Sequence, residues 1–328
     1  MIQHILEKAE NILVVTHVDP DGDAFGSLTA MGLALAQSDL RVSLVCDDNV
    51  PERFDFLPLV KKVQNRPSQS IQYDLLIAVD CGDEFRMGMA YASLPTPKPF
   101  IINIDHHVTN TQFGNINLVK PDASSTTEIL YRLFVDMGVE ITSELATSLL
   151  TGLVTDTLCF RTVGVSAETL RVGSDLVEAG ADLGFITMRA LNVRPFSTLK
   201  LWRTGMNKMS LEKGLLWTSI NSSEREAANF RSNSSVGLVN LLADVNEAAM
   251  GAVLMELSDG SIKVGLRCRP PFNVAEVAIA LGGGGHPLAS GCTLPGPLDE
   301  AENILVKACQ EAIDRQSAAL PEIEMEVS

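Results

Sequence analysis

The first half of the chain alternates short, continuously apolar segments with segments of helical pattern, and this alternation limits the possible folds more than any other feature. Strands that are buried on both faces of a sheet are apolar throughout rather than at every second residue. Such strands are expected at 11–16, 41–46, 74–79 and 99–104, and helices at 24–37, 126–137, 143–155 and 167–178. Strands that alternate with helices indicate an α/β protein with an open, mainly parallel sheet and helices on both faces.

The pattern changes near residue 188. A helical connector is expected up to about residue 209, interrupted at Pro195, and beyond it strands and helices mix in a different order. Strands 249–257 and 261–267 flank Ser258-Asp259-Gly260 and are typical of a hairpin. A length of 328 residues favours two domains. We expect an N-terminal domain at 1–188, a linker at 189–212 and a smaller C-terminal α/β domain at 213–318.

Composition excludes several classes of function. A formal net charge of −16 disfavours a protein that coats long nucleic acids, because such binding depends on neutralising phosphates with Lys and Arg. No apolar run approaches the roughly 20 residues of a membrane-spanning helix, and the first residues lack a basic signal-peptide start. The six cysteines are widely spaced, without a Cys-x-x-Cys pair, and fit unpaired thiols in a reducing compartment. We therefore expect a cytoplasmic protein without a membrane partner.

Side chains of the metal-ligand type cluster where the expected strands end. The clusters are 17–23 (HVDPDGD), 80–83 (DCGD) and 105–107 (DHH), with a fourth, 155–157 (TDT), at the end of a helix. Open parallel sheets bind ligands at this edge. Each cluster alone is as typical of a turn, a helix cap or a surface loop. Together they gather several carboxylates, which like-charge repulsion and desolvation oppose unless cations neutralise them.

The residue types indicate which ion would bind. Imidazoles and carboxylates without cysteine suit Mn²⁺ or a similar hard first-row ion better than a thiolate zinc site does. The number of carboxylates suggests two ions, and two-metal sites activate a water and hold the attacked phosphoryl group. We expect two Mn²⁺, which Mg²⁺ or Co²⁺ can replace.

Two groups of motifs resemble a known family. In order and approximate spacing, the N-terminal motifs resemble the four motifs of the DHH phosphoesterase family: His17-x-x-Pro20-Asp21-x-Asp23-Ala24-x-Gly26-Ser27, Asp80, Asp105-His106-His107 and Asp156. Near the other end, 282–291 (GGGGHPLASG) resembles the signature of the associated DHHA1 domain. Proteins with both domains at this length resemble the NrnA-type group of bacterial nanoRNases and phosphatases of 3′-phosphoadenosine 5′-phosphate (pAp). The resemblance implies a DHH metal-binding domain, a DHHA1 substrate-binding domain and an active site in the cleft between them.

The resemblance implies a role for each matching residue. One ion would be held by His17, Asp21 and Asp80. The second would be held by Asp23, Asp80, His106 and Asp156, so that Asp80 bridges the two. As further catalytic residues, Asp105 would orient a ligand imidazole, and His107 would face the substrate phosphate as a hydrogen-bond donor or proton shuttle.

In the C-terminal domain, the resemblance implies a substrate-binding face. Arg267 is a candidate clamp for a terminal phosphate, because a guanidinium can bond two oxygens at once. Gly283, Gly284 and Gly285 would let backbone N–H groups approach a phosphate or sugar, and His286 would contact the phosphate or base. A flexible helix stop is the alternative for the glycine run.

One position departs from the family pattern. Relatives often carry glycine directly after Thr-Asp-Thr, whereas this chain continues with 158–161 (LCFR). The departure leaves open how the backbone beside Asp156 is arranged, and with it the substrate preference.

The resemblance implies hydrolysis of short oligoribonucleotides to 5′-mononucleotides and removal of the 3′-phosphate of pAp. The partner would be a small nucleotide or short RNA oligomer rather than a long nucleic acid, and a homodimer is left open. A phosphodiesterase of cyclic or linear dinucleotides, such as c-di-AMP or pApA, is the main alternative, because the same site serves both. An inorganic pyrophosphatase would carry a different C-terminal domain, and a non-catalytic nucleotide-binding module would be expected to have lost a ligand.

Overall fold

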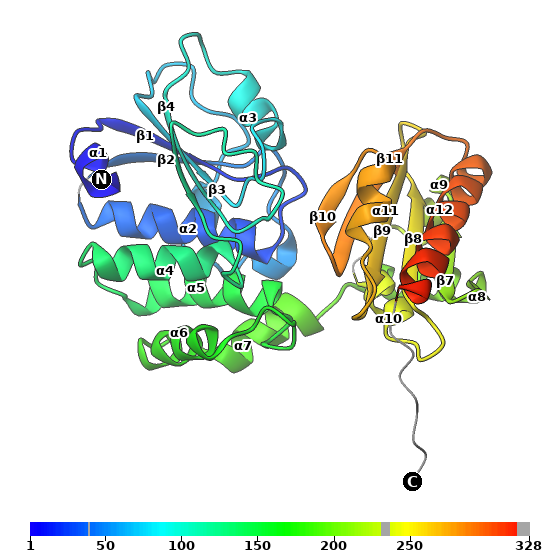
Figure 1. The fold of residues 1–328 in the computed structure, drawn as a ribbon. Helices are drawn as coiled ribbons and strands as arrows, with labels where there is room; N and C mark the ends of the chain where they lie inside the picture. The colour runs from blue at the N-terminus through cyan, green and yellow to red at the C-terminus, as the bar shows by residue number, and fades with distance from the viewer. Residues whose placement is uncertain (39, 231–236, 320–328) are drawn as a thin grey trace. The chain divides into compact units, whose positions relative to one another are not determined.

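A computed structural model describes residues 1–38, 40–230 and 237–319 of the chain (Figure 1). It contains two compact units, Met1–Val193 and Arg194–Ser328, and each has its own sheet and its own hydrophobic core. The α/β class is confirmed in both units. Among the helices of the described segments, none combines the length and apolar character needed to cross a membrane.

The sheet of the first unit is parallel throughout, as its continuous apolar strands predict. Its strands run in the order β2-β1-β3-β4-β5, and every neighbouring pair is parallel. The strands are β1 (Asn11–Val15), β2 (Arg41–Val45), β3 (Leu75–Val79), β4 (Phe100–Asp105) and β5 (Ile116–Val119). Because all five point the same way, the segments that follow β1, β3 and β4 meet at one edge of the sheet.

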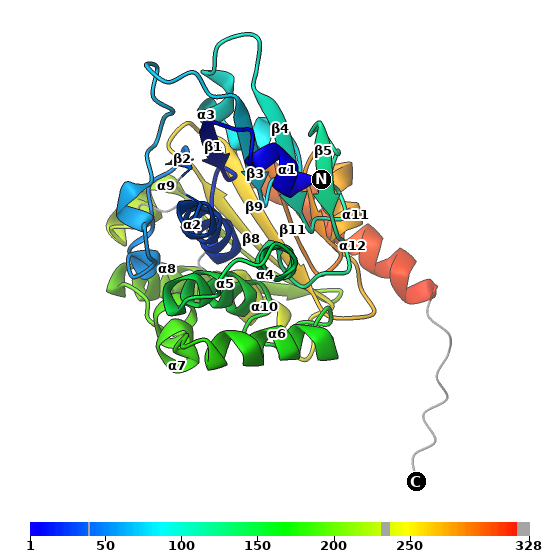
Figure 2. The same cartoon turned by 90° about the vertical axis from the view of Figure 1, so that its left-hand side faces the viewer.

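Long helices cover one face of this sheet (Figures 1 and 2). They are α2 (Gly22–Ala36), α4 (Thr126–Asp136) and α5 (Ser143–Asp156), and α6 (Ala167–Glu178) packs outside them. Glycine allows α2 and α5 to pack closely, because a Cβ on Gly26 would lie 2.7 Å from the carbonyl oxygen of Ser148. The opposite face carries only short elements among the described residues, namely the 3-10 turn η3 (Phe85–Met87) and α3 (Met89–Ala92).

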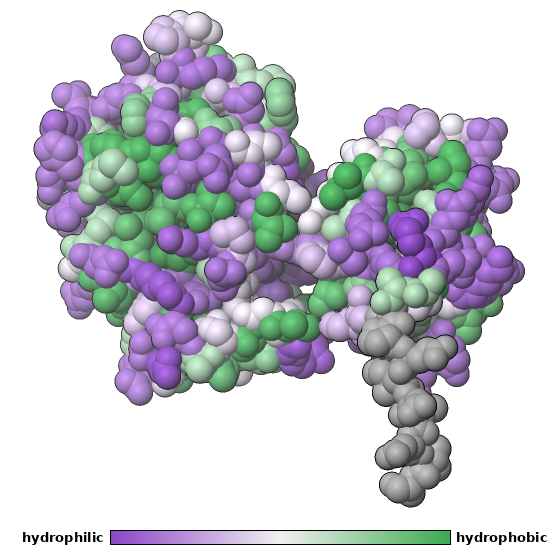
Figure 3. Space-filling model, viewed as in Figure 1, coloured by the Kyte–Doolittle hydropathy of each residue, from purple (hydrophilic) through white to green (hydrophobic). Residues whose placement is uncertain are grey.

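The N-terminal helix, α1 (Ile2–Leu6), lies against the same core. A cavity of about 420 Å³ lies among α1, α2 and α4, and buried side chains of β3 and β4 line it as well. Figure 3 shows hydrophobic surface around α1 and α2. Two further 3-10 turns, η1 (Glu52–Phe54) and η2 (Val60–Lys62), add apolar side chains to this core.

The helical connector expected from about residue 188 to residue 209 contains two elements, a π-helical turn and a helix. The helix α7 (Leu183–Thr187) continues into a π-helical turn, η4 (Met188–Asn192), which ends before Pro195. After it, α8 (Phe196–Asn207) packs against a strand of the second unit. A proline cannot donate a backbone hydrogen bond, which explains why the helical path is broken here.

The second unit has a mixed six-stranded sheet in the order β10-β11-β9-β8-β7-β6. Its strands are β6 (Ser210–Glu212), β7 (Leu215–Ile220), β8 (Met250–Glu256), β9 (Ile262–Cys268), β10 (Gly284–His286) and β11 (Ala289–Leu294). The predicted β8–β9 hairpin is confirmed. The helices are α9 (Ser222–Ala227), α10 (Leu238–Ala243), α11 (Ala275–Ala280) and α12 (Leu298–Ala318). The glycine run first ends α11, where Gly282 has φ of 78° and the amide of Gly283 donates to the carbonyl of Ala278, and then enters β10.

Candidate functional site

Asp80 lies at the centre of the polar cluster that follows the parallel strands. It comes directly after β3 with φ of 59°, and its amide donates a hydrogen bond to the carbonyl of Ile104 in β4. Its Oδ2 lies 3.4 Å from Nε2 of His17, and its Oδ1 accepts a hydrogen bond of 2.9 Å from the Thr126 hydroxyl. A left-handed backbone is costly for a residue with a Cβ and persists where surrounding contacts enforce it. The structure thus holds a strained, buried carboxylate in one orientation.

The loop after β1 brings a first group of ligand-type atoms to Asp80. Ligand atoms of His17, Asp21 and Asp80 lie within 4.8 Å of one another. The Nδ1 atom of His17 lies 2.7 Å from the carbonyl oxygen of Val18, which places the proton on Nδ1 and the lone pair on Nε2. Asp21 caps α2, and its Oδ1 accepts hydrogen bonds from the backbone amides of Asp23 and Ala24. This group can therefore offer one imidazole nitrogen and carboxylate oxygens to a cation.

A second group combines Asp23, His106 and Asp156, whose ligand atoms also lie within 4.8 Å of one another. The Nε2 atom of His106 is 3.4 Å from Asp156 Oδ2 and 4.0 Å from Asp23 Oδ2. The backbone amides at the start of α4, including that of Thr126 at 2.6 Å, donate to the Asp23 carboxylate. The other ring nitrogen of His106 faces the carbonyl oxygen of Ala123 at 3.2 Å. Backbone amides therefore fix the Asp23 carboxylate, and a backbone carbonyl fixes the His106 ring.

Asp105 contacts the second histidine of the pair, not the first. Its Oδ1 lies 2.7 Å from Nδ1 of His107, and its Oδ2 accepts a hydrogen bond of 2.6 Å from the amide of Asn110. The imidazole that Asp105 orients is therefore the one expected to face the substrate, whereas His106 is held by a backbone carbonyl. With Nδ1 engaged, the remaining nitrogen of His107 is the one that can act on a ligand.

Burial and mutual charge shift the pKa values of the cluster. Burial, reinforced by the charge of Asp80, raises the pKa of Asp23 to about 7, and burial raises that of Asp156 well above its usual value. Burial opposes protonation of His106, but the carboxylates led by Asp156 outweigh it and raise its pKa to about 9. Asp80 is the exception, because its imidazole neighbours outweigh burial and hold its pKa far below the usual range. Without cations, protons thus offset part of the charge, and divalent ions compete with protons for such ligands.

The residues after Asp156 adopt an unusual turn. Three consecutive residues have positive φ of 49°, 61° and 61°, namely Leu158, Cys159 and Phe160. Residues with a Cβ avoid this region, and glycine adopts it freely. The ring of Phe160 fixes the turn to α6 at Gly173, where a Cβ would lie 2.8 Å from the ring. Side-chain packing thus holds a turn that glycine residues would form with less backbone strain.

In the second unit, Arg267 and His286 lie on the same face of the sheet. Ala289 in β11 pairs with Arg267 in β9 on one side and with His286 in β10 on the other. Strands in a sheet are about 4.8 Å apart, so the two Cα atoms are about 10 Å apart. Side chains two residues along a strand share a face, so a neighbouring row on this face is formed by Gly265, Gly291 and Gly284. Arg267 and His286 therefore border a surface with little side-chain bulk.

The three glycines before His286 have different reasons to be glycine. A Cβ on Gly283 would lie 2.2 Å from the carbonyl oxygen of Gly291. Gly285 has φ of 137°, and its Cβ would lie 2.6 Å from the carbonyl oxygen of Ala289. A Cβ on Gly284 would meet nothing within 4 Å. Close packing between strands therefore requires glycine at 283 and 285, whereas Gly284 leaves open space over the sheet.

Several residues of the cluster were not found from the sequence. Thr126, which contacts both Asp23 and Asp80, could have been found from the predicted helix start at Ser125, because helix N-termini bind anions. Asn110 gave no local signal, since its role depends on the turn that carries it back to Asp105. Arg86 also gave none, although its Nη2 lies 3.2 Å from Nδ1 of His17.

Comparison with known proteins identifies the family. Residues 11–153 match the model of the DHH family, N-terminal domain, and residues 225–314 match the model of the DHHA1 domain. The chain is 33% identical over 318 residues to the bifunctional oligoribonuclease and PAP phosphatase NrnA of Thermus thermophilus, which covers 96% of this chain and 94% of the relative. The chain belongs to the DHH family. The resemblance inferred from the motifs is thereby confirmed.

Two further similarities concern this DHH protein. The crystal structure of an exopolyphosphatase-related protein from Bacteroides fragilis matches it with a TM-score of 0.85 and 26% identity, covering 96% of both chains. A probable manganese-dependent inorganic pyrophosphatase of Streptococcus mutans is 30% identical over 184 residues, which is 52% of this chain and 56% of that protein. The first supports the fold of both units.

Replacing Leu158 with glycine tests the strained turn. A left-handed backbone costs a residue with a Cβ about 1–2 kcal/mol of folding free energy. Replacement by glycine removes this cost, but the greater freedom of glycine in the unfolded chain offsets about 0.5–1 kcal/mol of the gain. We expect Leu158→Gly to raise the free energy of unfolding by about 0.5–1 kcal/mol in urea titrations. Leu170→Gly, at an exposed site inside α6, is the control and should lower it by about 1 kcal/mol. Destabilisation by both would show that the turn is unstrained.

The thermal stability of the metal-free DHH protein should fall as pH rises. The unfolded chain loses its protons near pH 3.8 at Asp23 and near pH 6.5 at His106, whereas the folded chain keeps them up to about 7 and about 9. The folding free energy contributed by these protons is greatest below the pKa values of the unfolded chain. It is lost as pH rises past the pKa values of the folded chain, about 7 and about 9. We expect Tm to decrease from pH 5 to pH 9, and Mn²⁺ to raise Tm more at pH 8 than at pH 6. His106→Gln should flatten the upper part of the profile, and a Mn²⁺ effect that is greater at pH 6 would contradict this expectation.

Proposed function

We propose that this DHH protein is a metal-dependent phosphoesterase that hydrolyses short oligoribonucleotides to 5′-mononucleotides and removes the 3′-phosphate of pAp. The observation that carries the proposal is the pair of imidazole–carboxylate groups joined through Asp80 at the C-terminal edge of the parallel sheet. The similarity over 96% of the chain to a relative named for both activities supports the choice of substrates. The catalytic domain would be 1–188 and the substrate-binding domain 213–318.

The donor set fits two Mn²⁺, or Mg²⁺ or Co²⁺ in their place. One ion would be held by His17, Asp21 and Asp80, and the other by Asp23, Asp80, His106 and Asp156. Oxygen and imidazole donors without thiolate suit these ions. The two oxygens of Asp80 support a bridging role, since Oδ2 lies 3.4 Å from His17 Nε2 and Oδ1 lies 3.9 Å from His106 Nε2. When bound, such ions supply an activated water and offset the charge that develops on the phosphoryl oxygens.

His107 would act directly on the substrate. Asp105 engages its Nδ1 at 2.7 Å, and Asn110 fixes Asp105 in turn. With Nδ1–H donating to Asp105, Nε2 can take up a proton and, in the doubly protonated imidazole, donate a hydrogen bond or that proton to a phosphoryl or leaving oxygen. Asp105 is therefore a positioning residue, because it acts through the imidazole.

The second unit would hold the substrate. Arg267 can bond two phosphate oxygens at once, and His286 lies two strands away on the same face. The glycine row beside them would let a sugar or phosphate approach the sheet closely. The similarity to the pyrophosphatase spans only 52% of this chain, whereas the DHHA1 match at 225–314 favours a nucleotide substrate.

Removing the negative charge of Asp80 should abolish activity. Asp80→Asn keeps the shape of the side chain but removes the charge that a bridging ligand needs, so we expect at least a 1,000-fold loss of kcat on pAp and on a dinucleotide, on the order of the larger single-residue losses in catalysis. Asp19→Asn, an exposed change in the loop after β1, is the matched control and should keep most of the activity. Release of phosphate and mononucleotide with Mn²⁺, with and without a chelator, is the measurement. Manganese-dependent turnover by Asp80→Asn, or none by the wild type on any of pAp, short RNA, c-di-AMP or pyrophosphate, would refute the proposal.

Alanine at Gly284 and at Gly285 should separate substrate contact from folding. Gly284→Ala adds a methyl group over the open surface, so we expect Tm to stay within about 2 °C and KM for pAp to rise several-fold. Gly285→Ala combines a positive φ with a backbone clash and should lower the free energy of unfolding by more than about 1 kcal/mol. Thermal melts and steady-state kinetics measure the two effects, and an unchanged KM in Gly284→Ala would remove this glycine from the proposed face.

A further inference from the structure

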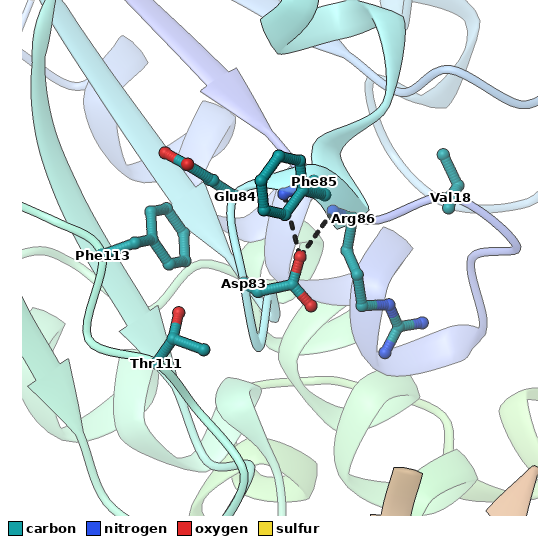
Figure 4. A pocket seen from close by; sticks show the side chains of 7 residues that line it. All are labelled: Val18, Asp83, Glu84, Phe85, Arg86, Thr111 and Phe113. Atoms are coloured by element: carbon teal, nitrogen blue, oxygen red, sulfur yellow. Dashed lines mark hydrogen bonds between the residues drawn. The ribbon is translucent and has the colours of Figure 1, made fainter. Parts of the chain in front are cut away.

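A cavity of about 860 Å³ lies next to the proposed metal ligands within the first unit (Figure 4). Its wall includes Val18, which directly follows His17, and the segment 83–86, which begins three residues after Asp80. The far wall comes from the segment before β5. Cavities of this size bind small molecules such as nucleotides. Its position makes it a candidate for the part of a substrate that adjoins the reacting phosphate.

A fixed turn presents an aromatic ring at this cavity. Asp83 Oδ1 accepts hydrogen bonds from the amides of Phe85 and Arg86 at 2.9 and 3.0 Å, and the amide of Val18 donates to the carbonyl of Arg86 at 2.7 Å. Phe85 nevertheless remains 84% exposed. A large apolar side chain held in water by a rigid turn gains stability only when a ligand covers it.

The remaining walls match the chemistry of a nucleoside phosphate. In Figure 4 the ring of Phe85 stands above Asp83, while Phe113 and Arg86 extend to opposite sides of it. Nucleobases stack on aromatic rings because every base has a π face. Carboxylates such as those of Asp83 and Glu84 accept hydrogen bonds from base amino groups and from ribose hydroxyls. One side of the cavity is thus aromatic and acidic, and the other carries a cation.

Arg86 supplies the cation beside the metal-ligand group. Its Nη2 lies 3.2 Å from Nδ1 of His17, but that nitrogen already faces the carbonyl oxygen of Val18 at 2.7 Å. A guanidinium has five N–H donors, and this contact engages one nitrogen of Arg86. Because Arg86 also lines the cavity, the same guanidinium can bind a phosphate there, for which planar bidentate donors are well suited.

We propose that this cavity binds one nucleotide of the substrate, with Phe85 stacking on its base and Arg86 binding its phosphate. The choice of a nucleotide rests on the proposed phosphoesterase function. The two side chains have separable roles, because stacking depends on the base and the guanidinium contact depends on the phosphate.

Equilibrium binding tests these roles without requiring turnover. Binding of AMP and of ribose 5-phosphate, which lacks the base, is measured by calorimetry with Mn²⁺ for the wild type, Phe85→Ala, Phe85→Trp and Arg86→Gln. We expect Phe85→Ala to weaken AMP binding about 10-fold and leave ribose 5-phosphate unchanged, whereas Phe85→Trp keeps AMP binding. Arg86→Gln should weaken both ligands by a similar factor.

Phe100→Ala is the matched control, because Phe100 is also an exposed phenylalanine but starts β4 at the opposite end of the strand from Asp105. It should leave binding of both ligands unchanged. Unchanged AMP binding in Phe85→Ala, or equal losses for AMP and ribose 5-phosphate in that variant, would overturn the stacking role. Hydrolysis of pAp by the wild type is measured separately, so failure of the proposed function is distinguished from failure of this site.

Discussion

Carboxylates that are packed together away from water are the constraint on which the first unit depends. Asp80 and Asp23 are 2% and 1% exposed, and both lie within 4.0 Å of the His106 imidazole. Like charges in a poorly solvated site raise the free energy of the folded state unless donors or cations offset them. The chain offers the start of α4 to Asp23 and the Thr126 hydroxyl to Asp80, and protons offset part of the rest. A site that stabilises itself only partly in this way gains the most from binding divalent ions.

Backbone packing in the first unit serves the same cluster. A Cβ on Gly22 would lie 2.3 Å from the Thr155 hydroxyl, and one on Gly152 would lie 2.4 Å from Asp23 Oδ1. The close approach of α2 to α5 therefore brings Asp23 and Asp156 to one imidazole. The positive φ values of Asp80 and of the turn after Asp156 add backbone strain, which the surrounding core must offset. Stability and ligand geometry are consequently coupled in these two helices.

The sequence was most informative where the signal is local and continuous. Apolar runs predicted β1, β3 and β4, since strands buried on both faces need no alternation. The edge strand β2 was also predicted, although Arg41 at its start is exposed. The strand β5 was missed because Ile116–Val119 is short and only half-buried at the sheet edge. The glycine run was ambiguous because its strand β10 exists only through pairing with β11, and α12 was not predicted although it contributes to the second core. The pairing of Asp105 with His107 could not be predicted either, because both histidines follow the same strand and only side-chain packing distinguishes them.

The net negative charge of this protein limits the length of the nucleic acid that it can bind. With a net charge of −16, the surface repels long polyanions, and attraction of a phosphate depends on local cations. Each unit carries an arginine beside a surface that is proposed above to bind part of a nucleotide. Arg86 borders an aromatic cavity in the first unit, and Arg267 borders a glycine-lined face in the second. These two guanidiniums and a pair of divalent metal ions would neutralise a few phosphates but not a long chain of them. The acidic excess of the whole chain therefore disfavours long nucleic acids and agrees with the proposed short substrate.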